Sequence, residues 1–340
     1  MFRDYLRQIV EGRNLDQDQM GRMIDEILSG NVTDAQVGAF MAALATKGET
    51  FEELAGAARA MRRKAQRIQV TAPVVVDTCG TGGDGLATFN ISTTTAFVVA
   101  GAGITVAKHG NRSVSSKSGS ADVLESLGVN LSTPPEIVEE AVAEIGIGFL
   151  FAPLYHSAMR HAGRARQEVG LRSIFNMLGP LTNPAGANCQ LLGVYAPQLT
   201  EMFAEALKLL GTRRALVVHG HDGLDEISVC AATRVSEIND GRVHTYDIQP
   251  EQYFGRLAEP ADLTGGDPQQ NADITRSVLS GQSGPCRDVV LINAAAALMA
   301  AGKVDDFDGG IEQAKLAIDS GGAMAKLDAL VEFTTANTQP

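Results

Sequence analysis

The sequence predicts an α/β protein with a small N-terminal helical domain and a larger α/β domain, whose mainly parallel central sheet is covered by helices. Residues 1–66 show apolar spacing typical of helices only. From Val74 onward, short β-branched runs alternate with helical stretches, a pattern typical of a parallel sheet covered by helices. We expect a helical domain at 1–68, joined by part of 155–190, and an α/β domain at 69–340.

The N-terminal helices are predicted from apolar faces and capping signals. The apolar residues of the second helix share one face: Met20, Met23, Ile24, Ile27 and Leu28. Gly30 is a stop signal after them. Thr33 with Gln36, and Thr50 with Glu53, have capping-box spacing and start the next two helices. A methionine-rich face of this kind is typical of a core, and any apolar patch left over would serve a dimer interface.

The rest of the chain supplies the elements of the α/β domain. Strands are expected at 73–79, 103–110, 128–132, 147–153, 189–197 and 214–221. Helices are expected at 92–102, 120–128, 134–146, 199–211, 271–281, 287–302 and 321–333. Residues 226–248 favour a β-hairpin that turns at Asp240-Gly241. The segment TGGDPQQ at 264–270 repeats letters of an earlier glycine loop, but we expect a surface turn there.

Composition excludes several classes of protein. The net charge of −12 argues against broad binding to nucleic acid or an anionic membrane, which depends on a positive field. No apolar run is long enough to cross a bilayer, and charges interrupt the N-terminal segment, so we expect a cytoplasmic protein. The cysteines, Cys79, Cys189, Cys230 and Cys286, form no Cys-x-x-Cys pair and are expected to be reduced thiols.

The first candidate site is the loop DTCGTGGDG at 77–85, between a predicted strand and a predicted helix. Without Cβ atoms, backbone N–H groups in such a loop can close around a phosphate. A tight structural turn remains the alternative. Asn90, Ser92, Thr93 and Thr94 follow at the helix start, and so dense a polar run favours an oxygen-rich ligand or a hydrated metal.

A second candidate loop, at 107–122, brings positive charge to an acidic chain. Lys108, Arg112 and Lys117 are accompanied by serines and by two glycines. A flexible linker has a similar composition. The position of this loop between a strand and a helix favours a binding site.

A third loop, at 217–228, collects acidic residues after a strand. Asp222, Asp225 and Glu226 offer the hard oxygen ligands that Mg²⁺ prefers. His219 and His221 lack a third zinc ligand at suitable spacing, so magnesium is favoured over zinc. A solvated acidic turn is the alternative.

A fourth segment, at 155–186, contains several arginines: Arg160, Arg164, Arg166 and Arg172. A helix with several arginines is usually a solvated face. One of them near a pocket could instead bind a carboxylate in bidentate fashion.

Taken together, these segments resemble the anthranilate phosphoribosyltransferase family of tryptophan biosynthesis. The resemblance covers nearly the whole chain. The matching motifs are Gly80-Thr81-Gly82-Gly83-Asp84, Lys108-His109-Gly110-Asn111, Gly119-Ser120-Ala121-Asp122, Asp225-Glu226 and RSIFNMLGPLTNP at 172–184. The order of these motifs is much more specific than any one of them.

The resemblance implies a homodimer through the helical domain, two Mg²⁺ ions per subunit, and transfer of phosphoribose from phosphoribosyl pyrophosphate to the amine of anthranilate. It implies donor binding by Gly80, Gly83, Asp84, Thr88, Asn90, Ile91, Ser92, Thr93, Lys108, His109, Gly110, Asn111, Arg112, Ser113, Val114, Ser115, Ser116 and Ser120. It implies anthranilate binding by Gly80, Asn111 and Arg166, and metal binding by Ser92, Asp225 and Glu226. No catalytic nucleophile is implied, because an aromatic amine needs little activation.

Two departures from the family pattern affect the acceptor side. Arg164-Ala165-Arg166 stands where the family often has Pro-Val-Arg, and Tyr155-His156-Ser157 where it often has His-His-Pro. The alternatives are a pyrimidine nucleoside phosphorylase, which shares the architecture, and a non-enzymatic relative that binds nucleic acid. The acidic balance and the Asp225-Glu226 pair argue against the second.

Overall fold

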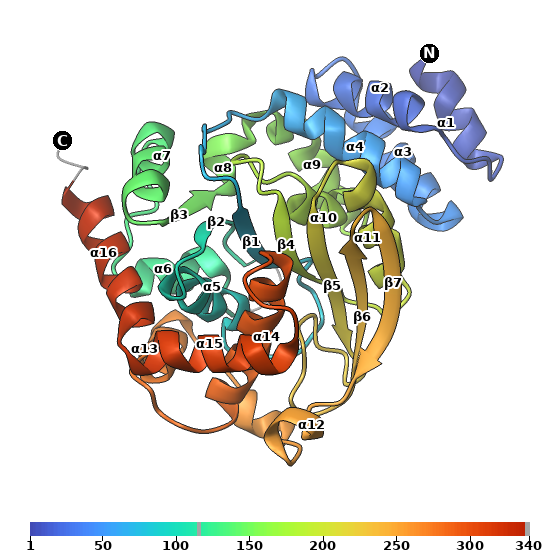
Figure 1. The fold of residues 1–340 in the computed structure, drawn as a ribbon. Coiled ribbons are helices and arrows are strands. Elements are labelled where there is room, and N and C mark those ends of the chain that lie inside the picture. Colours follow the sequence, from blue (N-terminus) through green and yellow to red (C-terminus); the bar gives the residue numbers. More distant parts are fainter. Residues whose placement is uncertain (114–116, 337–340) are drawn as a thin grey trace.

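The computed structural model of the chain describes residues 1–113 and 117–336, which form a seven-stranded sheet covered by helices (Figure 1). The strand order is β3-β2-β1-β4-β5-β6-β7. The strands are β1 (Val75–Gly80), β2 (Thr105–Gly110), β3 (Ile147–Phe151), β4 (Cys189–Gly193), β5 (Arg214–Gly220), β6 (Thr233–Asn239) and β7 (Arg242–Ile248). The first five are parallel to one another, and β6 and β7 are antiparallel to their neighbours. The predicted fold class is confirmed.

Four helices precede the sheet: α1 (Phe2–Val10), α2 (Gln17–Leu28), α3 (Asp34–Lys47) and α4 (Phe51–Lys64). Both predicted capping boxes are present, with the Thr33 and Thr50 side chains accepting from the backbone N–H groups of Gln36 and Glu53. The methionine face of α2 is buried, as expected of a core.

Three later helices, α9 (Arg160–Val169), α10 (Ile174–Leu178) and α11 (Leu199–Leu209), share a core with these four. The domain boundaries at 68 and 69 stay a prediction.

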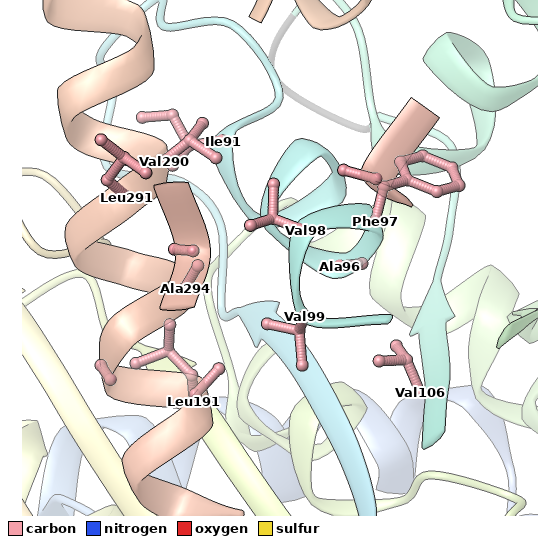
Figure 2. Packing of buried hydrophobic residues seen from close by; sticks show 14 of the residues in the cluster. Ile91, Ala96, Phe97, Val98, Val99, Val106, Leu191, Val290, Leu291 and Ala294 are labelled. Atoms are coloured by element: carbon pink, nitrogen blue, oxygen red, sulfur yellow. The ribbon is translucent and has the colours of Figure 1, made fainter. Parts of the chain in front are cut away.

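The two faces of the sheet pack against different helices, because neighbouring strand residues point to opposite sides. Leu191 of β4 belongs to a core with α5 (Ile91–Gly101) and α14 (Pro285–Ala300), and Leu192 to the core with α4 and α11. Figure 2 shows side chains of α5 and α14 meeting above Leu191. Burying a side chain of this size contributes about 1.5–3 kcal/mol. The sheet is therefore packed between two helical layers.

The remaining helices surround this arrangement: α6 (Ser120–Ser126), α7 (Pro135–Glu144), α8 (Ala152–Tyr155), α12 (Glu251–Phe254), α13 (Pro268–Leu279), α15 (Phe307–Asp319) and α16 (Gly322–Ala336). The β6–β7 hairpin turns at Asp240 and Gly241 with φ of 51° and 73°, as the Asp-Gly signal predicts. None of the described helices combines the length and apolarity needed to span a membrane.

One predicted strand is wrong. Residues 128–132 form turns and irregular backbone, although Val129 and Leu131 alternate as in a strand. The Asn130 side chain accepts from the N–H of Ser132, and the Thr133 hydroxyl donates to the carbonyl of Asn130. These local side-chain bonds satisfy the backbone without a neighbouring strand.

Candidate active site

The glycine loop after β1 is held from three sides at the carboxyl edge of the sheet. Thr81 N donates to the Gly193 carbonyl at 2.9 Å, and Gly82 N donates to Asp225 Oδ2 at 2.9 Å. Arg172 Nη2 donates to the Gly83 carbonyl at 2.8 Å. The loop is therefore a pre-formed structure, as an anion site at the edge of a parallel sheet requires.

Gly193, the last residue of β4, permits this arrangement and was not anticipated from the sequence. A Cβ on Gly193 would overlap the backbone carbonyl of Asp225. The chain carrying the acidic pair thus lies directly against the end of β4. The sequence gives no local signal for this contact, because the two residues are far apart along the chain.

Three carboxylates meet beside the glycine loop. Burial, reinforced by the nearby Asp84 carboxylate, raises the pKa of Asp225 to about 7. Burial and then the charge of Asp225 raise the pKa of Glu226 well above its ordinary value, while contact with the Ser92 hydroxyl acts in the opposite direction. Burial also raises the pKa of Asp84. So much mutually repelling negative charge favours a bound cation.

Lys108 of β2 is buried beneath this acidic group. Its ammonium donates to the backbone carbonyl of Thr78. Burial lowers the pKa of Lys108, and attraction to Asp77, Cys79 and Glu226 acts in the opposite direction. A buried cation next to the loop can balance the charge of an anionic ligand.

The N-terminus of α5 supplies the polar run predicted from the sequence. Asn90 stands at the N-cap, but its side chain accepts from no N–H of the first turn. Ile91 N, at the first helical position, donates to the Phe89 carbonyl at 2.8 Å. The Thr93 hydroxyl is buried without a hydrogen-bond partner among the described residues. The Ile91 side chain is buried in the core, so Ile91 can reach a ligand only through its backbone. Thr88 forms an isolated bridge with Thr264.

The loop after β2 is organised around α6. Gly110 ends β2, and the Asn111 carbonyl accepts from the Ser120 hydroxyl at 3.3 Å. Asp122 accepts from the backbone N–H of Ser113 at 3.0 Å.

Arg112 binds Asp122 and Glu125, each at 2.8 Å, so in this structure its guanidinium is paired with acidic side chains. The predicted donor-binding residues Val114, Ser115 and Ser116 lie outside the described residues.

The residues predicted to bind the acceptor lie around α9 and the end of β2. His109 Nδ1 lies 3.2 Å from the Gly179 carbonyl, and its ring lies 5.1 Å from that of His156. The Arg166 guanidinium carbon lies 5.6 Å from the centre of the Phe175 ring, and burial lowers the pKa of Arg166. Arg172, which follows α9, binds the Gly83 carbonyl and so connects this part of the chain to the glycine loop, a contact that the sequence did not reveal.

The buried imidazoles of His109 and His156 make stability depend on pH. Burial lowers the pKa of His109 to about 3 and that of His156 to about 4, both below the ordinary value of 6.5. At a pH between the folded pKa and 6.5, each imidazole is protonated in the unfolded chain but neutral in the folded chain. The free energy of unfolding therefore falls as the pH falls below 6.5. From pH 7 to pH 5 each imidazole should cost about 2 kcal/mol of unfolding free energy. Chemical denaturation at the two pH values should show a smaller loss in His156→Gln; an equal loss in both proteins would contradict the assignment.

A divalent metal was predicted at Ser92, Asp225 and Glu226. Within residues 1–113 and 117–336, no three His, Cys, Asp or Glu side chains are arranged to hold a metal by themselves. The Glu226 Oε2 atom is nevertheless buried without a hydrogen-bond partner in the described part of the chain. Such a donor set fits Mg²⁺, which takes few protein carboxylates and completes its shell with water and phosphate oxygens.

Asp222 and His219, the other residues of this loop that were considered as metal ligands, have structural partners. Asp222 accepts from the Ser228 hydroxyl at 2.6 Å and from the N–H of Leu224 at 3.3 Å. His219 Nδ1 lies 2.7 Å from the Val194 carbonyl. The acidic run therefore divides into a turn-forming Asp222 and a site-facing Asp225-Glu226 pair.

The chain is similar to known proteins over nearly its whole length. The model of the glycosyl transferase family a/b domain matches residues 72–324, and that of its helical bundle domain matches residues 3–65. An anthranilate phosphoribosyltransferase of Syntrophobacter fumaroxidans is 68% identical over 99% of this chain and 100% of that protein.

Two solved structures share the fold. The crystal structure of anthranilate phosphoribosyltransferase from Thermus thermophilus is 42% identical with a TM-score of 0.93, covering 98% of this chain and 99% of the other. The Saccharomyces cerevisiae enzyme in complex with PRPP and Mg is 29% identical with a TM-score of 0.90, covering 98% of both chains.

Proposed function

Since this chain belongs to the anthranilate phosphoribosyltransferase family, we propose that it transfers phosphoribose from phosphoribosyl pyrophosphate (PRPP) to the amine of anthranilate. The products are N-(5-phosphoribosyl)anthranilate and pyrophosphate. The observation that carries this function is the meeting of the glycine loop, Lys108 and the Asp225-Glu226 pair at one edge of the sheet. The full-length identity to a curated anthranilate phosphoribosyltransferase supports the same activity.

The donor is proposed to bind across the loops after β1 and β2. The glycine loop at 80–84 and the start of α5 would bind its phosphate oxygens, with Lys108 supplying buried positive charge. Within that loop, Thr81 N and Gly82 N donate to Gly193 and Asp225 and so hold its shape. Ser120 and the segment 109–116 would complete the site. Arg112 would have to exchange a carboxylate partner for a phosphate to take part.

Magnesium is proposed to bind at Ser92, Asp225 and Glu226, with two ions per subunit. When bound, it supplies positive charge that stabilises the departing pyrophosphate. Before that, the chain's own residues must hold the pair of carboxylates in place. The bond from Gly82 N to Asp225 Oδ2 does so by joining the acidic pair to the glycine loop.

The acceptor is proposed to bind near Asn111, Gly80 and Arg166. The anthranilate nitrogen forms a bond to ribose C1 as the bond from C1 to pyrophosphate breaks, and the nitrogen then loses a proton. No nucleophilic side chain is needed, so catalysis depends on positioning and charge. Because its pKa is lowered to about 3, His109 stays neutral and acts as a hydrogen-bonding group.

Arg166→Ala should mainly raise the KM for anthranilate, because the guanidinium would bind the acceptor carboxylate in both ground and transition states. Arg164→Ala is the matched control, since Arg164 lies on the same helix and is exposed, paired with Glu168. Steady-state kinetics with each substrate varied would measure this. A variant that lost affinity only for PRPP would contradict the role of Arg166.

A homodimer through the helical domain and a cytoplasmic location stay predictions. Sedimentation equilibrium of the purified protein would test the first.

The activity is tested by mixing the protein with anthranilate, PRPP and Mg²⁺ and following the loss of anthranilate fluorescence. We expect a loss that requires all three components. Phosphorolysis of thymidine without anthranilate turnover would instead favour the nucleoside phosphorylase.

A further inference from the structure

The second glycine-rich segment, at 263–271, lies against the donor site. We call it the strap. Phe89 N donates to the Leu263 carbonyl at 3.2 Å, and Gly265 N donates to the Ala87 carbonyl at 2.7 Å. A Cβ on Gly265 would lie 2.6 Å from Phe89 N, so the close approach requires glycine here. The strap is thus paired along the chain that leads from the glycine loop into α5.

Asn271, at the end of the strap, continues this contact with its side chain. It is 1% exposed. Its Oδ1 accepts from the backbone N–H of Gly266 at 2.7 Å, and its Nδ2 donates to Asn90 Oδ1 at 2.9 Å. Asn271 therefore connects the strap to a residue of the predicted donor site.

These bonds fix which way the amide of Asn90 faces. A backbone N–H can only donate, so the Gly266 N–H requires Oδ1 of Asn271 on its side. Nδ2 of Asn271 must then face Asn90, which has to present its own oxygen. At its other end Asn90 Nδ2 donates to the Ser118 carbonyl at 3.2 Å, which can only accept. Two backbone groups on opposite sides thus specify one orientation.

We propose that Asn271 is a positioning residue that orients the Asn90 amide, and with it the start of α5 and the backbone at Ser118, for the phosphoribosyl donor. The inference rests on the proposed function. Asn90 is bonded to Ser118 in the loop after β2 and to Asn271 in the strap, so its amide joins three chain segments at the donor site. The TGGD segment at 264–267 therefore supports the chain between the first glycine loop and α5 and does not form a second phosphate-binding loop.

Asn271→Asp tests the proposal because it keeps the shape and the acceptor but replaces the Nδ2 donor with an oxygen. That oxygen would face Asn90 Oδ1. The Asn90 amide would then either keep two oxygens facing each other or turn its own oxygen toward the Ser118 carbonyl, and in both cases a bond that positions Asn90 is lost. We expect the KM for PRPP to rise by about tenfold, as for loss of a supporting bond to a ligand-binding group, with the KM for anthranilate little changed. Asn271→Ala removes the donor without adding charge and should raise the same KM.

Asn188→Asp is the matched control. Asn188 makes the same pair of bonds, accepting from Val75 N and donating to the Pro73 carbonyl, but at the opposite edge of the sheet. It should leave both KM values unchanged. Thermal unfolding of each variant shows that it is folded; if Asn271→Asp does not fold, Asn271→Ala gives the same readout.

A double-mutant cycle separates positioning from a general loss of packing. In an Asn90→Ala background, Asn271→Ala should have almost no further effect on the KM for PRPP, since the group that it orients is absent. An equal effect in both backgrounds, or an unchanged KM in folded Asn271→Asp, would overturn the proposal while leaving the proposed function intact. A wild-type protein that neither binds PRPP nor turns over anthranilate would overturn both.

Discussion

Replacing both acidic residues, Asp225→Asn with Glu226→Gln, should lower turnover by about 10²-fold or more. The two carboxylates are buried beside Asp84. Burial and then repulsion from Asp84 raise the pKa of Asp225, and burial and then repulsion from Asp225 raise the pKa of Glu226. The neutral amides keep the shape of the site but lose the charge that would hold Mg²⁺. Turnover measured across a range of Mg²⁺ concentrations should show a much weaker dependence on the metal.

Asp222→Asn is the control for this pair. Asp222 lies in the same loop, but its carboxylate accepts hydrogen bonds that close the turn. We expect it to lower stability by about 1 kcal/mol without changing the dependence on Mg²⁺. If the double variant responded to Mg²⁺ as the wild type does, the metal would not be held by Asp225 and Glu226.

Gly193→Ala should also lower turnover by about 10²-fold, although Gly193 carries no side chain. The new methyl group would occupy the position of the Asp225 carbonyl, so the backbone at Asp225 would have to move. The bonds from Gly82 N to Asp225 and from Thr81 N to Gly193 would move with it. A misplacement of about 1 Å in a catalytic constellation can cost about 10²-fold in rate.

Gly163→Ala is the matched substitution. Gly163 lies within α9, and a Cβ there meets no atom within 4 Å. It should be neutral, or stabilise the helix by about 1 kcal/mol. Thermal unfolding and steady-state kinetics of both alanine variants would check this. Full activity in Gly193→Ala would show that the acidic pair does not depend on the end of β4.

Much of the fold could be predicted because its signals are local. The capping boxes at Thr33 and Thr50 and the Asp240-Gly241 turn act within a few residues, and all three are present. A strand was wrongly predicted at 128–132 because Val129 and Leu131 alternate and are buried, although this segment is not part of a strand. Alternation of apolar residues indicates burial of one face, but in this segment the Asn130 and Thr133 side chains bond the local backbone groups and no strand pairing is described there.

In the candidate site, too, features with a local sequence signal could be predicted and contacts between distant segments could not. Its glycine loop and acidic pair can be recognised in the sequence because the residue types themselves indicate phosphate and metal binding. The contacts of Gly193, Arg172 and Asn271 do not, since each depends on a segment distant in sequence. Nothing in the acidic run itself separates Asp222, which closes a turn, from Asp225, which bonds to the glycine loop.

The central claim is that one edge of the sheet binds the donor's diphosphate together with a divalent ion. A crystal structure of the protein with PRPP and Mg²⁺ tests it most directly. The account predicts diphosphate oxygens against the glycine loop at 80–84 and a metal at about 2.1 Å from oxygens of Asp225 or Glu226. Diphosphate bound elsewhere, with both carboxylates free of metal, would contradict it.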